Sequence, residues 1–156
     1  MTRHLAYRHT QTYTVLWLIL IVAAAVTVPA TMGSTATPEG LAGVLLVLAT
    51  FLAGLLLLGR LVIEVDSEAV RWSFGYVGWP AWQEPLKSIV STELGKANVA
   101  FGSGIKGTAK HRQFNVVISG PALRLHLMDG RSVTLGTPEP QRLQGFIEAR
   151  RDQRLK

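Results

Sequence analysis

The chain is 48% apolar and carries a formal net charge of +6. Its 156 residues leave room for one modest soluble domain beside a membrane segment. It has no cysteine, so a disulfide framework, a thiolate nucleophile and a cysteine metal site are excluded. Most of the positive charge lies in residues 60–156. A basic domain of this kind suits an anionic membrane surface or nucleic acid, and a membrane segment favours the first.

Two uncharged apolar runs, residues 13–32 and 41–58, dominate the first third of the chain. At about 1.5 Å per residue, a helix of roughly 20 residues spans the 30 Å hydrocarbon core of a bilayer. A buried helix of a soluble protein is the alternative, but neither run has a polar face. We therefore expect a cytoplasmic N-terminal tail at residues 1–12 and a two-helix transmembrane hairpin at residues 13–59.

The charges beside this hairpin predict its orientation. Arg3 and Arg8 precede the first run and Arg60 follows the second, whereas the connection at residues 33–40 has no lysine or arginine. The positive-inside rule then places both termini in the cytoplasm, in a multi-pass protein of the inner cell membrane. Three aromatic residues at the start of the first run predict an anchor at the headgroup level: Tyr7, Tyr13 and Trp17.

A cleaved signal peptide is the alternative for the first apolar run. Arg3, Arg8 and the small residues at 34–36 resemble its flanking regions, but the run exceeds the roughly 7 to 15 residues that are usual there. Even after cleavage, the second run would span the membrane and Arg60 would keep the domain inside.

From Leu61 onward the apolar residues alternate, which predicts a small antiparallel β domain at residues 60–156. Residues 75–85 form an aromatic, proline-rich connection, in which Trp79 and Trp82 are either core residues or contacts for a membrane or partner. The expected strands are residues 61–66, 70–74, the centre of 86–94, 113–118, 123–127 and 133–135.

The last two strands are joined by Asp129-Gly130, which predicts a hairpin with a type I′ turn. A helix should follow, with Thr137 as its N-cap and Pro138 at its first position, and should run to about Arg151. Its apolar face would cover one open end of the sheet or barrel, through Leu143, Phe146 and Ile147.

Residues 102–107 match the G-x-G-x-x-G pattern of dinucleotide-binding sites. That pattern requires the third glycine to open a helix within a βαβ unit, and here Gly107 leads into a β segment. A cofactor-using membrane enzyme built on this glycine loop is therefore an alternative and not our expectation. The four histidines are scattered and no carboxylates pair, so we expect no metal, no cofactor and no catalytic residues.

Two basic clusters are candidate contact sites. The first is a loop with Lys106, Lys110 and Arg112, and the second is a C-terminal group with Arg150, Arg151 and Arg154. A solvated surface is one explanation. Beside an anionic leaflet, however, each well-placed cation adds about 1 kcal/mol of attraction, so anionic lipid headgroups or an unidentified protein partner are possible ligands. Nucleic-acid binding by the C-terminal group is a further alternative that we do not expect.

Several short motifs give the chain a family resemblance. They are Gly104-Ile105-Lys106, Phe114-Asn115-Val116, the stretch from Leu127 to Arg131, and the stretch from Leu135 to Pro138. With two N-terminal membrane helices before them, the chain resembles the bacterial PH-like domain proteins anchored by a transmembrane hairpin. The resemblance implies a β sheet or barrel closed by a C-terminal helix, and no catalytic residues.

The expected protein is therefore a membrane-anchored α+β protein without enzymatic activity. It would present a PH-like domain at the cytoplasmic face as a scaffold or adaptor that binds protein or anionic lipid. Fold does not specify function, so this remains a hypothesis about the domain's surface.

A reporter fused after Lys156 tests the predicted orientation. Because the cationic residues flank the hairpin outside its connection, a reporter that works only in the cytoplasm should be active and a periplasmic reporter silent. Periplasmic activity would show that the orientation is wrong.

Overall fold

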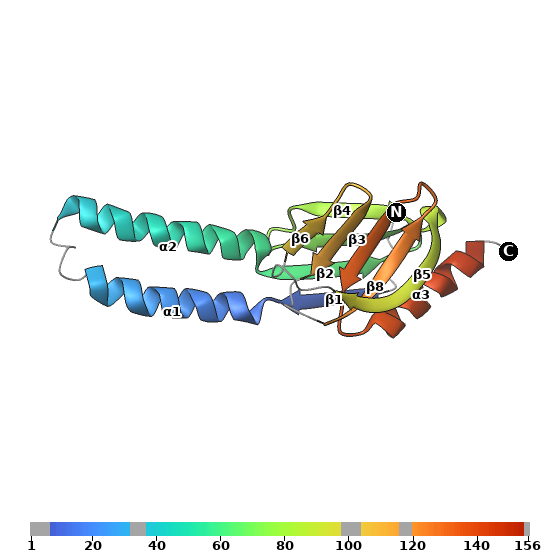
Figure 1. The fold of residues 1–156 in the computed structure, drawn as a ribbon, viewed down its shortest axis with the longest axis horizontal. Helices are drawn as coiled ribbons and strands as arrows, with labels where there is room; N and C mark the ends of the chain where they lie inside the picture. Colours follow the sequence, from blue (N-terminus) through green and yellow to red (C-terminus); the bar gives the residue numbers. More distant parts are fainter. Residues whose placement is uncertain (1–6, 32–36, 98–103, 116–119, 155–156) are drawn as a thin grey trace.

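The computed structural model describes residues 7–31, 37–97, 104–115 and 120–154, and it is an α+β fold with two parts along its long axis (Figure 1). A pair of helices forms one end, and two β-sheets with a C-terminal helix form the other. The expected β domain with a closing helix is confirmed at this level.

The helical pair consists of α1 (Thr14–Thr31) and α2 (Pro38–Leu58), which lie side by side. Thr37 caps α2, since its hydroxyl accepts a hydrogen bond from Gly40 N at 3.2 Å. Within the described residues, one helical stretch, Pro38–Leu57, is long and apolar enough to cross a membrane, and only 6% of it is buried. The apolar stretch of α1, Trp17–Thr27, is shorter.

Sheet A continues directly from these helices. It has the order β1-β2-β3-β4 and every pair is antiparallel. Its strands are β1 (Tyr7–Thr12), β2 (Arg60–Val65), β3 (Ala69–Phe74) and β4 (Ala81–Pro85). The predicted hairpin of residues 61–74 is confirmed as β2 and β3. No strand was expected at β4, where Pro80 and Pro85 bound a short edge strand, a position that tolerates proline.

The expectation of a tail at residues 1–12 is wrong for Tyr7–Thr12, which form β1 at the edge of sheet A. Tyr7 is therefore a core residue and not a headgroup anchor, because its side chain is 5% exposed and lies 5.4 Å from the Phe146 ring. Gln11 is also buried and donates a hydrogen bond to Gly136 O at 2.6 Å. Polar residues dominate this strand, so its sequence has little apolar alternation to reveal it.

Sheet B has the order β5-β8-β9-β7-β6, in which only the β7–β9 pair is parallel. A short 3-10 helix, η1 (Leu86–Ser88), leads from sheet A into it. Its strands are β5 (Ile89–Ala97), β6 (Gly104–Gly107), β7 (His111–Asn115), β8 (Gly120–Leu127) and β9 (Ser132–Gly136). The predicted strand 113–118 begins two residues early, and its last three residues lie outside the described part of the chain.

The core lies between the sheets and centres on aromatic rings from both. Phe114 of sheet B lies 4.8 Å from Trp82 and 5.2 Å from Trp72, both of sheet A. Phe74 meets Trp82 edge-on at 6.1 Å. Such tilted and edge-on contacts are favourable for aromatic quadrupoles, so Trp82 is settled as a core residue.

The C-terminal helix, α3 (Pro140–Arg154), closes the domain with the predicted apolar face. Leu143 and Ile147 are buried and Phe146 is partly buried against the same core. The helix begins two residues later than expected, because its first backbone bond runs from Leu143 N to Glu139 O at 3.1 Å, which makes Glu139 and not Thr137 the residue before the helix. The Thr137 hydroxyl accepts from Glu139 N at 3.3 Å just ahead of it.

The hairpin at Asp129-Gly130 is confirmed, but its turn is not type I′. Gly130 has φ +78°, whereas no described residue other than glycine has a positive φ. The Leu127 amide donates to Arg131 O at 2.9 Å, which is typical of a three-residue loop with glycine in the left-handed position. Arg131 donates to the Asp129 carboxylate and holds the pKa of that carboxyl below its usual value.

Replacing Tyr7 tests whether β1 belongs to the folded domain. Tyr7→Ala should lower the free energy of unfolding by about 3 kcal/mol, because it removes a buried ring and leaves a cavity. Denaturant unfolding of the full chain in detergent measures this, with the exposed Met128→Ala as the control. A cost as small as that of Met128→Ala would contradict a core role for β1.

Tyr7 also predicts a response to alkaline pH. Burial raises the pKa of its phenol, and the Thr137 hydroxyl opposes this with a smaller effect. A raised pKa means that folding favours the neutral phenol, so this stabilisation is complete below about pH 10 and is lost as pH rises further. Tyr7→Phe should therefore unfold less readily than the unchanged chain above pH 10.

Candidate functional site

The outer face of sheet B, which points away from the core, carries a continuous set of polar side chains. In β8, Leu123, Leu125 and Leu127 point inward and are buried, so Arg124 and His126 point outward. Strand pairing extends this face across the sheet. We define the outer face by Ser91, Glu93, His111, Gln113, Arg124, His126, Ser132 and Thr134.

The strand register arranges these residues in two rows. Glu93 pairs with Arg124, Arg124 with Thr134, and Thr134 with Gln113. In the second row Ser91 pairs with His126, His126 with Ser132, and Ser132 with His111. Residues from four strands, far apart in sequence, thus form one continuous polar surface.

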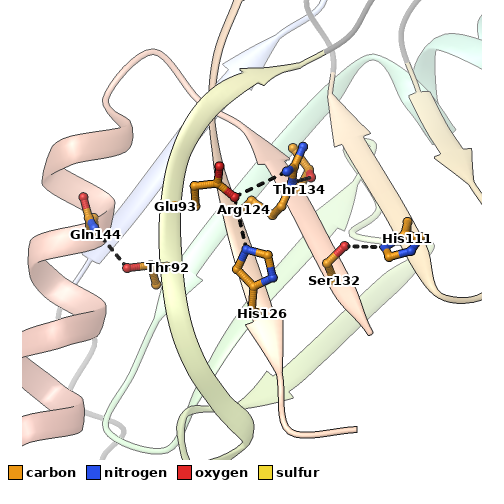
Figure 2. A network of polar contacts seen from close by, with 8 residues as sticks. All are labelled: Thr92, Glu93, His111, Arg124, His126, Ser132, Thr134 and Gln144. Atoms are coloured by element: carbon orange, nitrogen blue, oxygen red, sulfur yellow. Dashed lines mark hydrogen bonds and ion pairs between the residues drawn. The ribbon is translucent and has the colours of Figure 1, made fainter. Parts of the chain in front are cut away.

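Glu93 contacts both Arg124 and His126, the two central residues of this face (Figure 2). Its Oε2 atom lies 3.3 Å from Arg124 Nη1 and 3.2 Å from His126 Nε2. Arg124 Nε also donates to Thr134 Oγ1 at 3.5 Å. These side chains are solvent-accessible, so the ion pairs contribute little to folding stability.

A depression of about 420 Å³ lies on this face and is lined partly by Arg112, Arg124, His111 and His126. No acidic residue lines it, and the hydroxyls of Ser132 and Thr134 lie at its base, since both side chains are largely buried. Arg112 pairs with the buried Val133, so alternation directs its side chain to the opposite face, and Arg124 supplies the guanidinium on this one. A guanidinium and hydroxyl donors in one concavity suit a carboxylate or phosphate group.

The structure brings together one pair that the sequence did not suggest. His111 Nδ1 lies 2.8 Å from Ser132 Oγ, although 21 positions separate them. A catalytic serine needs a base that a third group orients. Within the described residues, none of the ion pairs or hydrogen bonds joins His111 to a carboxylate. The pair is thus a polar contact within the face, and the described residues do not add the third group that a catalytic triad requires.

The predicted basic residues fall at opposite edges of sheet B. Lys106 lies in β6, paired with Gln113, while Lys110 and Arg112 are exposed in the β6–β7 hairpin. The other three lie in the last turns of α3, which packs against β5 and β8: Arg150, Arg151 and Arg154. Arg151 donates to Val90 O at 2.7 Å. The structure therefore does not combine the two clusters into one site.

The position of α3 weakens the argument that the basic residues at its C-terminal end contact lipid. Its C-terminal end lies at the opposite end of the molecule from α1 and α2 (Figure 1). If these helices span a membrane, the C-terminal end of α3 lies far from that membrane.

The glycine-rich segment does not have the geometry of a dinucleotide site. Gly104–Gly107 form β6, which pairs antiparallel with β7, and a short turn follows Gly107 where the motif needs a helix. Gly102 and Ser103 lie outside the described residues. The described ranges also contain no group of three histidine or acidic residues that could hold a metal ion.

No family model, no curated protein sequence and no solved structure matches the chain. The geometry of the chain itself is thus the basis for a functional proposal.

Two neighbouring residues of β5, Thr92 and Glu93, test which side of sheet B contributes to folding stability. Thr92 faces α3, where it donates to Glu148 at 2.8 Å and accepts from Gln144 at 3.0 Å, whereas Glu93 lies on the outer face. Thr92→Val should cost about 1 to 2 kcal/mol of folding free energy, because it removes two partly buried hydrogen bonds, those to Glu148 and Gln144.

Glu93→Gln should change the same quantity by less than about 1 kcal/mol, since exposed ion pairs contribute little. Denaturant unfolding of both variants checks the difference. Equal costs would mean that the outer face is part of the structural framework.

Proposed function

We propose that this protein is a non-enzymatic membrane-anchored binding module, with a PH-like β domain that faces the cytoplasm. Its outer face of sheet B binds an acidic segment of a protein partner. The observation that carries the proposal is the direct continuation of the apolar helix α2 into β2 through a single residue, Gly59.

The exposed surface of the helical pair supports membrane anchoring. Leu46 of α2 is 70% exposed, and Leu18, Ile21 and Val26 of α1 are exposed as well. A contiguous apolar surface of this kind is unfavourable in water and stable in hydrocarbon. In a two-span arrangement, α1 would cross beside α2, with both termini in the cytoplasm as the flanking arginines predict.

The chemistry of the outer face supports an acidic ligand. Arg124 supplies a guanidinium donor with His111 and His126 beside it, and Glu93 competes as an internal anion. An incoming carboxylate replaces Glu93 as partner of Arg124, so the face binds weakly and reversibly, as befits an adaptor. The C-terminal end of α3 lies at the far end from the helices, which argues against contact of its cations with the anchoring bilayer.

The first test is membrane attachment. Because α2 presents apolar side chains on all sides, the full chain should stay with the membrane pellet after alkaline carbonate washing and should be released by detergent. Release by carbonate alone would contradict an integral membrane protein.

The second test is binding of an acidic probe by the full chain in neutral phosphatidylcholine nanodiscs. Poly-L-glutamate should bind, binding should fall as salt rises, and Arg124→Ala should weaken it about 3- to 10-fold. Glu93→Gln should strengthen it, because the internal competitor loses its charge. Lys87→Ala is the matched control, since Lys87 is an exposed cation outside this face.

Phosphatidylglycerol vesicles separate the two candidate ligands. If they bind more tightly than poly-L-glutamate and Arg124→Ala weakens them equally, the ligand of this face is a lipid. If neither probe binds, or if Lys87→Ala has the same effect as Arg124→Ala, the proposed face is wrong.

A further inference from the structure

The turn between β3 and β4 exposes apolar side chains beside the end of α2. We define the apolar tip as Tyr76, Val77 and Trp79, of which Val77 is 71% and Trp79 64% exposed. Trp82, three residues on, is instead packed 4.8 Å from Phe114 in the core. The core therefore does not account for the residues of the tip.

Backbone contacts hold the apolar tip against the last turn of α2. Tyr76 N donates to Leu56 O at 2.8 Å, and Gly75 N donates to Arg60 O at 2.8 Å. Gly75 has φ +70°, and a Cβ atom there would lie 2.3 Å from Leu56 O. Only glycine allows this close approach, which fixes the position of the apolar tip along the axis of α2, level with its last turn.

The apolar tip therefore lies at the same position along the helix axis as the junction of both helices with the β domain. Tyr13 N donates to Gly59 O at 2.8 Å, so the start of α1 and the end of α2 lie together. Trp17 lies one helical turn into α1 and its side chain is exposed. Tryptophan and tyrosine prefer the headgroup level of a bilayer, where an apolar ring and a polar group are both accommodated.

A cation lies at the same level. Arg60 Nε donates to Gly75 O at 2.9 Å, and its guanidinium carbon lies 5.0 Å from the centre of the Tyr76 ring. Arginine beside aromatic side chains at the end of an apolar helix suits contact with lipid phosphates.

We propose that the apolar tip inserts into the headgroup region of the bilayer that α2 crosses. The inference rests on the proposed membrane anchoring and adds a third contact beside α1 and α2. A contact off the helix axis restricts tilting of the β domain, so the outer face of sheet B keeps one orientation to the membrane.

The absence of cysteine from the chain allows single labels to test this. Val77→Cys carries a fluorophore on the tip, and Met128→Cys is the matched control, since Met128 is 74% exposed. Met128 lies at the end of the β domain that is remote from α2. Its backbone N donates to Ser88 O, and Leu86 N, two residues before Ser88, donates to Glu68 O in the β2–β3 turn. Leu46→Cys reports on α2 itself.

The labelled full chains are placed in phosphatidylcholine vesicles and quenched by shallow nitroxide lipids or by a water-soluble nickel chelate. The Val77 label should be quenched several-fold more by the lipid than the Met128 label, and several-fold less by the chelate. Lipid quenching at Leu46 with aqueous exposure at Val77 would overturn the tip insertion and keep the membrane span. Aqueous exposure at Leu46 would overturn both, and protection of Val77 from both quenchers would indicate a protein contact in place of lipid.

Discussion

The junction between the helical pair and sheet A determines the rest of the architecture. The hydrogen bond from Tyr13 N to Gly59 O joins the end of β1 to the start of β2. At this point β1 leads into α1, and α2 leads into β2. Two antiparallel strands therefore continue as two antiparallel helices. Because one residue separates α2 from β2, the helices and the domain form a continuous unit along the long axis (Figure 1).

This constraint assigns different roles to the two ends of the β domain. Turns next to the helices, such as the one that carries Val77 and Trp79, stay beside the end of α2. The β2–β3 turn, η1 and the β8–β9 turn lie at the far end, where Arg131 links Asp129 and Glu84 through ion pairs. On the proposed topology, the near end meets lipid and the far end meets the cytoplasm.

Side chains of the sheet B strands alternate between the core and the outer face, so core packing and polar contacts involve different residues. Inward leucines of β8 pack on the aromatic core, whereas the outward Arg124 and His126 contact Glu93 at the surface. Adjacent positions of β5 make the same division, since Thr92 joins α3 and Glu93 joins the outer face. On the proposed function, the ligand chemistry of the outer face is therefore separate from the packing of the core.

Much of the local structure followed from the sequence, and the failures have definite causes. The β2–β3 and β8–β9 hairpins and the buried side of α3 were predictable because apolar residues repeat at the period of each element. The strands β1 and β4 were not, because polar residues and prolines hide an edge strand that a neighbour stabilises. The type of the Asp129 turn also escaped, since a two-residue motif does not specify loop length.

The candidate site was the least predictable feature. Clustering of cations along the chain drew attention to Lys106, Lys110 and Arg112 and to the end of α3, which lie at opposite edges of sheet B. Glu93, Arg124, Thr134 and Gln113 come together only through the order of four strands. Strand order depends on long-range pairing, which local periodicity does not encode.

The sequence by itself determined the two apolar runs, the change to β periodicity after Arg60 and the closing amphipathic helix, because each depends on the spacing of apolar residues. Tertiary structure decided that Tyr7 belongs to the core, that Trp79 and Trp82 have opposite environments, and that the outer face of sheet B gathers distant polar side chains. The physical reason is that burial and strand pairing depend on which segments meet in space, and residues remote in sequence make those contacts.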